Sequence, residues 1–293
     1  MRLRRTELSR ILSFTIVACR QPAPIKARIF RVGKSGQQEQ PLITDPWFYV
    51  AAIPAVWLFG IAKGGFGGGL GVVAVPLMAL VVSPLQAAAV LLPILCLMDL
   101  VGLWVYRGKW LWPELRILVP ASIIGIVAGT LLFGYMSVAV LRLIVGTVAI
   151  VFTLHFFVTS RQRPAAGLPP FPPAVGLIAG AAGGFTSFIA HSGGPPISMY
   201  LLRRPLDRTD FVATTVMLFA VINYVKLAPY AWLGQLSTEN LMTSAVLSPL
   251  APIGVYTGVW LHRKVSDAFF FRLMYVLLFV VGGKLLYDGL TAI

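Results

Sequence analysis

The sequence has 293 residues, of which 58% are hydrophobic and only 12% are charged, and its mean hydropathy is +0.84. Soluble domains carry about 25% charged residues, so this composition excludes a soluble globular protein. The formal net charge of +14 would suit nucleic-acid binding, but the basic residues mostly lie between apolar runs or in the first 44 residues. This distribution favours a membrane protein with basic cytoplasmic loops and no nucleic-acid partner.

The first 44 residues differ in composition from the rest and hold nine of the 24 lysines and arginines. Their apolar stretch, 11–19, is too short to span a bilayer and resembles a weak signal segment without a clear cleavage site. We therefore expect 1–44 to be a disordered or membrane-surface tail, or to reflect a wrongly assigned start.

Two sets of apolar elements follow, in 45–160 and in 174–293, separated by a Pro-rich basic linker at 161–173 that we place in the cytoplasm. The first two elements of each set are short and interrupted by glycine or proline, so each pair can form a re-entrant hairpin instead of two full crossings. The remaining elements have the length of ordinary spans. The expected elements are 47–62, 66–82, 85–106, 117–134 and 138–159, then 174–188, 194–202, 211–232, 241–261 and 269–287.

The two sets resemble each other in sequence. GGF at 64–66 matches GGF at 183–185, Pro76 and Pro195 follow at the same spacing, and SPL at 83–85 corresponds to RPL at 204–206. An odd number of elements per set predicts that the second copy is inverted. Placing the loop 107–116 in the cytoplasm, with Lys63 on the same side, puts twelve basic residues there and one in the opposite short loops. The sequence therefore predicts an all-α polytopic fold of two inverted repeats, each a broken hairpin followed by three spans.

Inverted repeats that open with broken helices are typical of secondary transporters, whose site lies near the bilayer midplane. Glycines at the break can bring backbone N–H groups close to a small anion and restart a half-helix whose positive end faces it. The alternative is that these glycines only allow close helix packing. The candidates from the two breaks are Gly67, Gly68, Gly69, Ser192, Gly193 and Gly194.

Polar residues inside the predicted spans are the remaining candidates. Asp99 is the only carboxylate well inside a span, where an unpaired charge costs at least about 2.5 kcal/mol; it can carry a coupling proton or have a structural role, such as holding a lysine. Lys226 and Asn223 share a helix face and can bind an anion, although Lys226 can also pair with Asp99. His191 can donate to the anion, relay a proton or simply pack.

Other chemistry has little support in the sequence. No cluster of histidine, cysteine and acidic residues has the spacing of metal ligands, and GGFGGGLG lacks the lysine and hydroxyl residue of a phosphate loop. No nucleophile motif is present. We therefore predict that the protein is not an enzyme and uses no cofactor and no metal.

Three stretches together resemble the TauE/SafE family of sulfite-exporter-like permeases, over about residues 47–290. The resemblance implies export, less often uptake, of small anions such as sulfite, organosulfonates or sulfur-bearing carboxylates across the bacterial cytoplasmic membrane, without ATP hydrolysis. It also implies that the glycine, His191, Asn223 and Lys226 candidates lie in signature segments. The stretches are GIAKGGFGGGLGVVAVPLMAL at 60–80, LLPILCLMDLVGLWVYRGKW at 91–110, and GGFTSFIAHSGGPPISMYLL at 183–202 continuing to NYVKLAPYAWLGQLS at 223–237.

Together, the residues and the resemblance predict a secondary transporter of small anions that works by alternating access. We expect a multi-pass protein of the bacterial inner membrane whose partners are the anion, the lipid bilayer and a coupling proton or ion. The alternatives are a channel-like anion pore and a membrane partner subunit that does not itself transport. No oligomeric state follows from the sequence.

Overall fold

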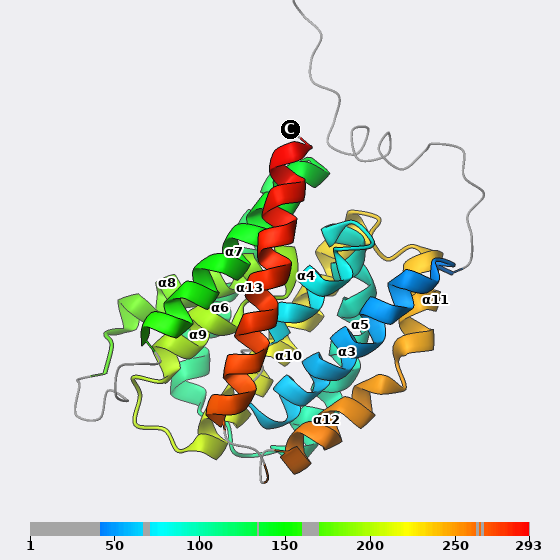
Figure 1. Cartoon of the computed structure of the whole chain (residues 1–293). Coiled ribbons are helices and arrows are strands. Elements are labelled where there is room, and N and C mark those ends of the chain that lie inside the picture. The colour runs from blue at the N-terminus through cyan, green and yellow to red at the C-terminus, as the bar shows by residue number, and fades with distance from the viewer. Residues whose placement is uncertain are drawn as a thin grey trace, which may run out of the picture. The chain divides into compact units, whose positions relative to one another are not determined.

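The computed structural model describes residues 42–66, 71–133, 135–159, 170–261, 264 and 267–292. The chain divides into two units, Met1–Gln37 and Gln38–Ile293, and the first lies outside the described residues. Nearly all of the predicted tail, and most of the predicted linker, therefore lie outside them. Within the described part of the second unit every regular element is a helix (Figure 1), which confirms the all-α prediction.

Six described helices are long and apolar enough to cross a membrane, and a bent pair provides a seventh candidate. The six are α3 (Pro46–Gly65), α5 (Pro84–Val105), α6 (Trp112–Phe133), α7 (Val138–Thr159), α8 (Pro173–Ala190) and α10 (Arg208–Trp232). The others are the 3-10 turn η2 (Gly71–Val73), α4 (Ala74–Met78), α9 (Gly194–Leu201), the bent pair α11 (Thr238–Leu247) and α12 (Leu250–Leu261), and α13 (Asp267–Thr291).

Side-chain caps fix the starts of several spans. Asp45 accepts a hydrogen bond from the backbone N–H of Trp47 at the start of α3, and Ser83 accepts one from Gln86 at the start of α5. Asp207 and Ser237 cap α10 and α11 in the same way. These bonds satisfy N–H groups that have no partner within the helix, and they are a reason why the observed starts lie near those expected.

The opening hairpin of each set has one long and one short leg. α3 and α8 have 20 and 18 residues and can span a bilayer, whereas α4 and α9 have only five and eight. Helix α3 is thus longer than the predicted element 47–62, because it continues through Lys63, Gly64 and Gly65. Residues 67–70, at the break between α3 and η2, lie outside the described residues.

The prediction of one unbroken span over 241–261 is wrong. This stretch forms α11 and α12, which are bent by 43° at Ser248 and Pro249. Proline has no N–H to donate, and its ring clashes with the carbonyl of the residue four positions earlier, so the helix cannot pass straight through Pro249.

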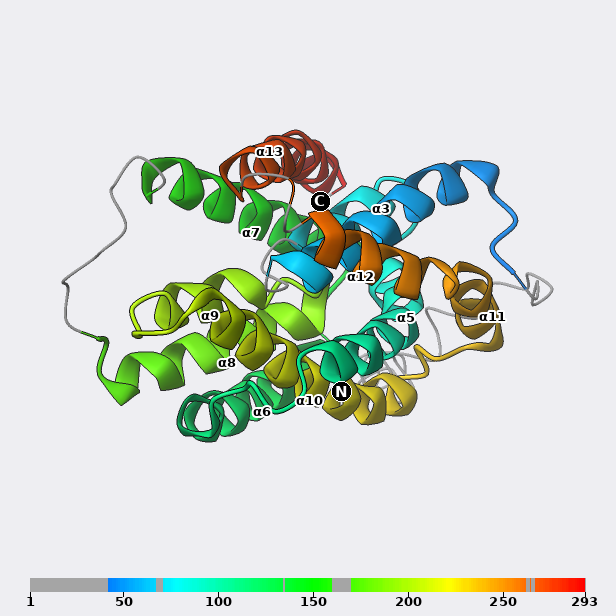
Figure 2. The same cartoon turned by 90° about the horizontal axis from the view of Figure 1, so that it is seen from below.

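Packing between the sets is reciprocal. α3, the first helix of set one, packs along α12 of set two, and α8, the first helix of set two, packs along α6 of set one. The corresponding helices α5 and α10 pack on each other, as do α7 and α13 (Figure 2). A two-fold relation between the repeats predicts this exchange of partners. The inverted orientation of the second repeat remains a prediction.

Close packing explains two of the glycines in the two hairpins. A methyl group on Gly64 would lie 2.1 Å from the carbonyl oxygen of Val255, and one on Gly184 would lie 2.0 Å from that of Ser122. Both distances are far below van der Waals contact, so only glycine lets α3 approach α12 and α8 approach α6 this closely. The packing alternative therefore accounts for these two positions.

We predict that Gly184→Ala destabilises the protein because the added methyl group forces α8 away from α6. Overpacking of this kind costs about 1–3 kcal/mol, so the melting temperature in detergent should fall by several degrees, at about 2–4 °C per kcal/mol. The matched control is Gly283→Ala in α13, where no neighbouring atom lies within 4 Å of the added carbon. Equal melting temperatures for the two variants would contradict the packing role of Gly184.

Candidate functional site

Polar side chains gather in the interior where α3, α5, α8 and α10 approach one another. Lys226 and Asp99 are 0% exposed, Lys63 and Asn223 are 3% exposed, and His191 is 4% exposed. Buried charges of this kind inside a membrane protein are expensive, which makes them functional candidates. They form two neighbouring hydrogen-bonded clusters.

The first group, which we call the Asp99 cluster, consists of Lys63, Asp99 and Asn223. Nζ of Lys63, in the last turn of α3, lies 2.5 Å from Oδ1 of Asp99 and 3.3 Å from the carbonyl oxygen of Leu95. Nδ2 of Asn223, from α10, donates to Oδ2 of Asp99 at 2.7 Å. Both oxygens of the carboxylate therefore have a close partner, one of them a charge.

The second group, which we call the Lys226 cluster, consists of Lys226, Ser187 and His191. Nζ of Lys226 contacts the carbonyl oxygen of Ser187 at 3.0 Å, its Oγ at 3.0 Å and Nδ1 of His191 at 2.7 Å. An ammonium group has three protons, so these three acceptors use all of them. Asp99 pairs with Lys63 instead, and within the described residues Lys226 has no carboxylate in ion-pair contact.

His191 has its tautomer fixed by its neighbours. Nε2 lies 2.9 Å from the carbonyl oxygen of Ala88, which can only accept, so Nε2 carries the proton. Nδ1 then has a lone pair that accepts from Lys226, and the ring is neutral. His191 also ends α8 in a left-handed conformation with φ 50°, the one non-glycine residue with positive φ among those described. This backbone is sparsely populated, although histidine adopts it more often than most residues.

Two side chains of α10 donate to carbonyl groups in the last turn of α8, and one of these carbonyls, that of Ser187, also accepts the backbone N–H of His191. Besides Lys226 on the carbonyl of Ser187, Tyr230 donates its hydroxyl to the carbonyl oxygen of Phe188 at 2.6 Å. The partial negative charge of a helix C-terminus also stabilises a nearby cation. Lys226 thus has a capping role that must be separated experimentally from any role in binding.

The two clusters are neighbours. Asn223 and Lys226 lie one turn apart on α10, and Lys226 is close enough to both Lys63 and Asp99 for their charges to act on it. With both lysines protonated, Asp99 ionised and His191 neutral, these buried groups have one net positive charge. An arrangement of this kind attracts a small anion and excludes a cation.

The structure places some of the predicted candidates together and leaves others untested. Asp99, His191, Asn223 and Lys226 meet in the two clusters. Ser192 follows His191 and donates its hydroxyl to the carbonyl oxygen of Ala190 at 3.0 Å, and a methyl group on Gly193 would lie 2.5 Å from the carbonyl oxygen of Gly183. Gly194 is the first residue of α9. Gly67, Gly68 and Gly69 lie outside the described residues.

Sequence reasoning missed Lys63 and Ser187. Lys63 was counted with the cytoplasmic loops because it ends an apolar run and precedes glycines, but α3 continues past it and buries it against Asp99. A buried carboxylate requires a buried cation, which was the available signal. Ser187 gave no signal, because a serine in an apolar helix usually bonds within its own helix.

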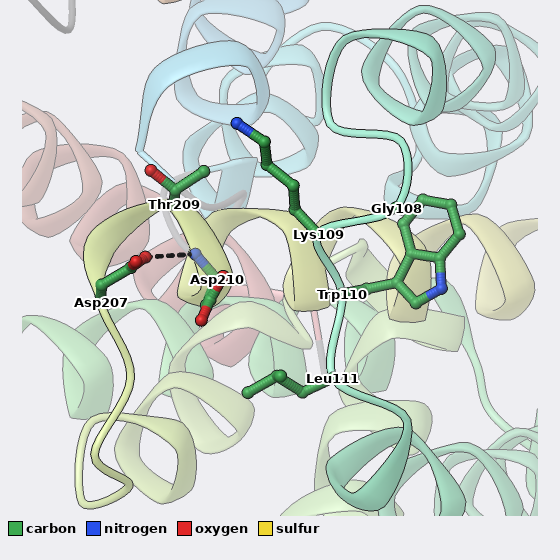
Figure 3. Close-up of a pocket in the computed structure, with 7 residues that line it drawn as sticks. All are labelled: Gly108, Lys109, Trp110, Leu111, Asp207, Thr209 and Asp210. Atoms are coloured by element: carbon green, nitrogen blue, oxygen red, sulfur yellow. Dashed lines mark hydrogen bonds between the residues drawn. The ribbon is translucent and has the colours of Figure 1, made fainter.

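A separate open pocket of about 370 Å³ lies between the loop after α5 and the start of α10 (Figure 3). In Figure 3, Asp207 accepts the backbone N–H of Asp210, at 2.7 Å, which is the cap of α10. None of the predicted site residues lines this pocket, so it is distinct from the two clusters. Its lining residues are Gly108, Lys109, Trp110, Leu111, Asp207, Thr209 and Asp210.

The fold and the buried charges define a multi-pass helical membrane protein with a polar interior. The family model for sulfite exporter TauE/SafE matches residues 52–285, which is most of the chain. The protein therefore belongs to the TauE/SafE family, as the sequence motifs predicted, and has a membrane transport role. No curated protein and no solved structure gives a significant match.

We predict that the Lys63–Asp99 ion pair is strongly coupled. Asp99→Leu leaves a buried ammonium without its partner and should cost about 3–5 kcal/mol of stability, whereas Lys63→Met combined with Asp99→Leu should cost much less because no buried charge of the pair remains. The free energy of unfolding in detergent, measured for both single variants and the double variant, gives the coupling.

The matched control is the ion pair between Lys284 and Asp288 one turn apart on α13, where the lysine is 57% exposed. Asp288→Leu should cost under about 1 kcal/mol. Additive losses in the Lys63 and Asp99 variants would mean that the buried pair does not behave as a unit.

Proposed function

We propose that the protein is a secondary transporter that moves small anions, sulfite, organosulfonates or related sulfur-containing or carboxylate anions, across the bacterial cytoplasmic membrane. The anion binds at the Lys226 cluster and the adjacent face of the Asp99 cluster. Export is the proposed direction, in keeping with the family to which the chain belongs. The observation that carries the proposal is the ammonium group of Lys226, fully buried and held by neutral acceptors alone among the described residues.

Binding is an exchange of partners at Lys226. An anion oxygen takes the place of Nδ1 of His191 or of the Ser187 hydroxyl as an acceptor, and the displaced hydroxyl can turn and donate to the anion. Asn223 donates one amide proton to Asp99 and has a second to offer. The acceptors that the anion displaces are neutral, whereas the anion adds Coulomb attraction to the buried ammonium group, so the exchange favours the anion.

Access to this site requires a conformational change, because its polar and charged side chains are 0–4% exposed in the structure. The described conformation is thus a closed one. The reciprocal packing of α3 on α12 and of α8 on α6 forms two similar units that can move against each other around α5 and α10. We therefore propose alternating access, in which movement of these two units opens the site to one side of the membrane at a time.

Lys226→Met should abolish saturable uptake of radiolabelled sulfite or thiosulfate into proteoliposomes, because it removes the charge that holds the anion while keeping a side chain of similar length. The matched control is Tyr230→Phe, which removes the neighbouring cap on α8 without changing any charge. That variant should lose stability but keep uptake at its wild-type half-saturation concentration.

Several outcomes would contradict the proposal. Equal loss of uptake in Lys226→Met and Tyr230→Phe, at equal melting temperatures, would mean that Lys226 only caps α8. Flux that rises linearly with anion concentration would indicate a channel-like pore instead of a carrier. Absence of flux for every anion tested in the wild-type protein would favour a membrane partner subunit without transport of its own.

A further inference from the structure

We propose that the Lys63–Asp99 pair adjusts the charge of the site to that of the anion: a doubly charged anion binds together with one proton, taken up by Asp99, and a singly charged anion binds without one. This inference rests on the proposed function, because it assigns an anion class and a proton count to the same site. In this inference Lys63 supplies the second positive charge that a doubly charged anion needs.

The geometry that supports it is the position of Asp99 between the ammonium group of Lys63 and the amide group of Asn223, with Lys226 one turn further along α10. One carboxylate oxygen lies 2.5 Å from Nζ of Lys63, and the other accepts from Asn223 at 2.7 Å. Asn223 is one turn from Lys226 on the same helix, and the charges of Asp99 and Lys226 are close enough to act on each other. A change of charge at Asp99 therefore changes what both lysines can hold.

Charge balance gives the consequence. With Asp99 ionised, the site has one net positive charge, which a monoanion neutralises. A dianion would leave a net negative charge in the dehydrated interior, which is unfavourable. When a proton from the aqueous phase binds Asp99, Lys63 loses its counterion, the site has two net positive charges, and a dianion neutralises them. The one covalent change is the O–H bond that forms on the Asp99 carboxylate as hydronium gives up its proton.

Other titratable side chains surround Asp99 and must be separated from it in any test. Lys63 of α3, Lys226 and Tyr224 of α10, and Cys96 one turn earlier on α5 all act on it electrostatically. His191 of α8 contacts Lys226. Of the other helices packed on α5, α4 has no titratable residue, and the rest contribute Arg142 and His155 of α7, Glu239 of α11 and Tyr256 of α12.

The test compares anions of fixed charge. Thiosulfate remains a dianion and methanesulfonate a monoanion between pH 6 and 8.5, whereas sulfite itself exchanges a proton near neutrality and is unsuitable. Isothermal titration calorimetry on the purified full chain should show Kd for thiosulfate rising as pH increases, approaching about tenfold per pH unit, which is the slope for one linked proton. Kd for methanesulfonate should lack this slope.

Two variants assign the proton to Asp99. Asp99→Asn keeps an oxygen to accept from Lys63 and fixes the residue as neutral, so it should bind thiosulfate with the low-pH affinity at every pH. Lys63→Gln removes one positive charge, so thiosulfate binding should be lost. Methanesulfonate would then bind only together with a proton on Asp99, so its Kd should rise with increasing pH. The matched control, Asp288→Asn, removes a partly exposed carboxylate paired with Lys284 and should keep the wild-type slope.

The outcomes separate this inference from the function beneath it. Thiosulfate binding that needs Lys226 but is flat with pH, or a slope that survives in Asp99→Asn, would overturn the inference and leave the proposed function standing. A lower melting temperature of Asp99→Asn with an unchanged slope would likewise reduce the pair to a structural role. Thiosulfate binding by Lys226→Met at wild-type affinity would contradict the proposed function itself.

Discussion

The energetic constraint on which the rest of this structure depends is a buried ammonium group without a buried carboxylate of its own. Lys226 is completely enclosed and is held by a carbonyl, a hydroxyl and a neutral imidazole. Leaving a buried charge uncompensated costs about 3–5 kcal/mol. A protein that served only as a membrane scaffold could avoid this cost with an apolar residue at the same position. An anion that enters the site neutralises the charge of Lys226. Binding therefore recovers free energy that burial of the unpaired ammonium group costs.

The scaffold is arranged to hold this charge in place. α8 ends at His191 in a left-handed turn, so its last carbonyl groups face α10, which supplies Lys226 and Tyr230 as their donors. His191 is fixed in turn by the carbonyl of Ala88 on α5. Because α5 also carries Asp99, the central helices α5 and α10 connect the two clusters. Movement of either helix would alter both at once, as a transporter requires of its binding site.

Much of the fold could be predicted from the sequence because apolar length and helix caps are local signals. The starts near Asp45, Ser83 and Asp207 lie close to those expected from the apolar runs, and these residues cap the helices. The sequence predicted two short legs in each opening hairpin, whereas the structure has one long leg and one short leg. The bend at Pro249 was missed because the apolar run continues through it without a change in composition. Hydropathy reports which residues can enter a membrane but not whether their helix is straight.

The site could be predicted only in part, because its partners come from distant segments. Asp99, Asn223 and Lys226 could be found as polar residues within spans, where each is unusual by itself. Their actual pairing could not, since nothing in the sequence decides whether Lys63 or Lys226 faces Asp99. The roles of Ser187 and of the carbonyl group of Ala88 could not be predicted either, because the fold decides which backbone carbonyl groups face His191 and Lys226.

The most direct test of the central claim is to locate a bound anion. Crystals of the protein grown with selenate allow the anion to be located, because selenium scatters anomalously. The anomalous peak should mark a selenate ion with an oxygen atom within about 3.2 Å of Nζ of Lys226, the distance of a hydrogen bond. A peak confined to the open pocket beside Lys109 and Asp210, with Lys226 still bound to Ser187 and His191, would contradict the account.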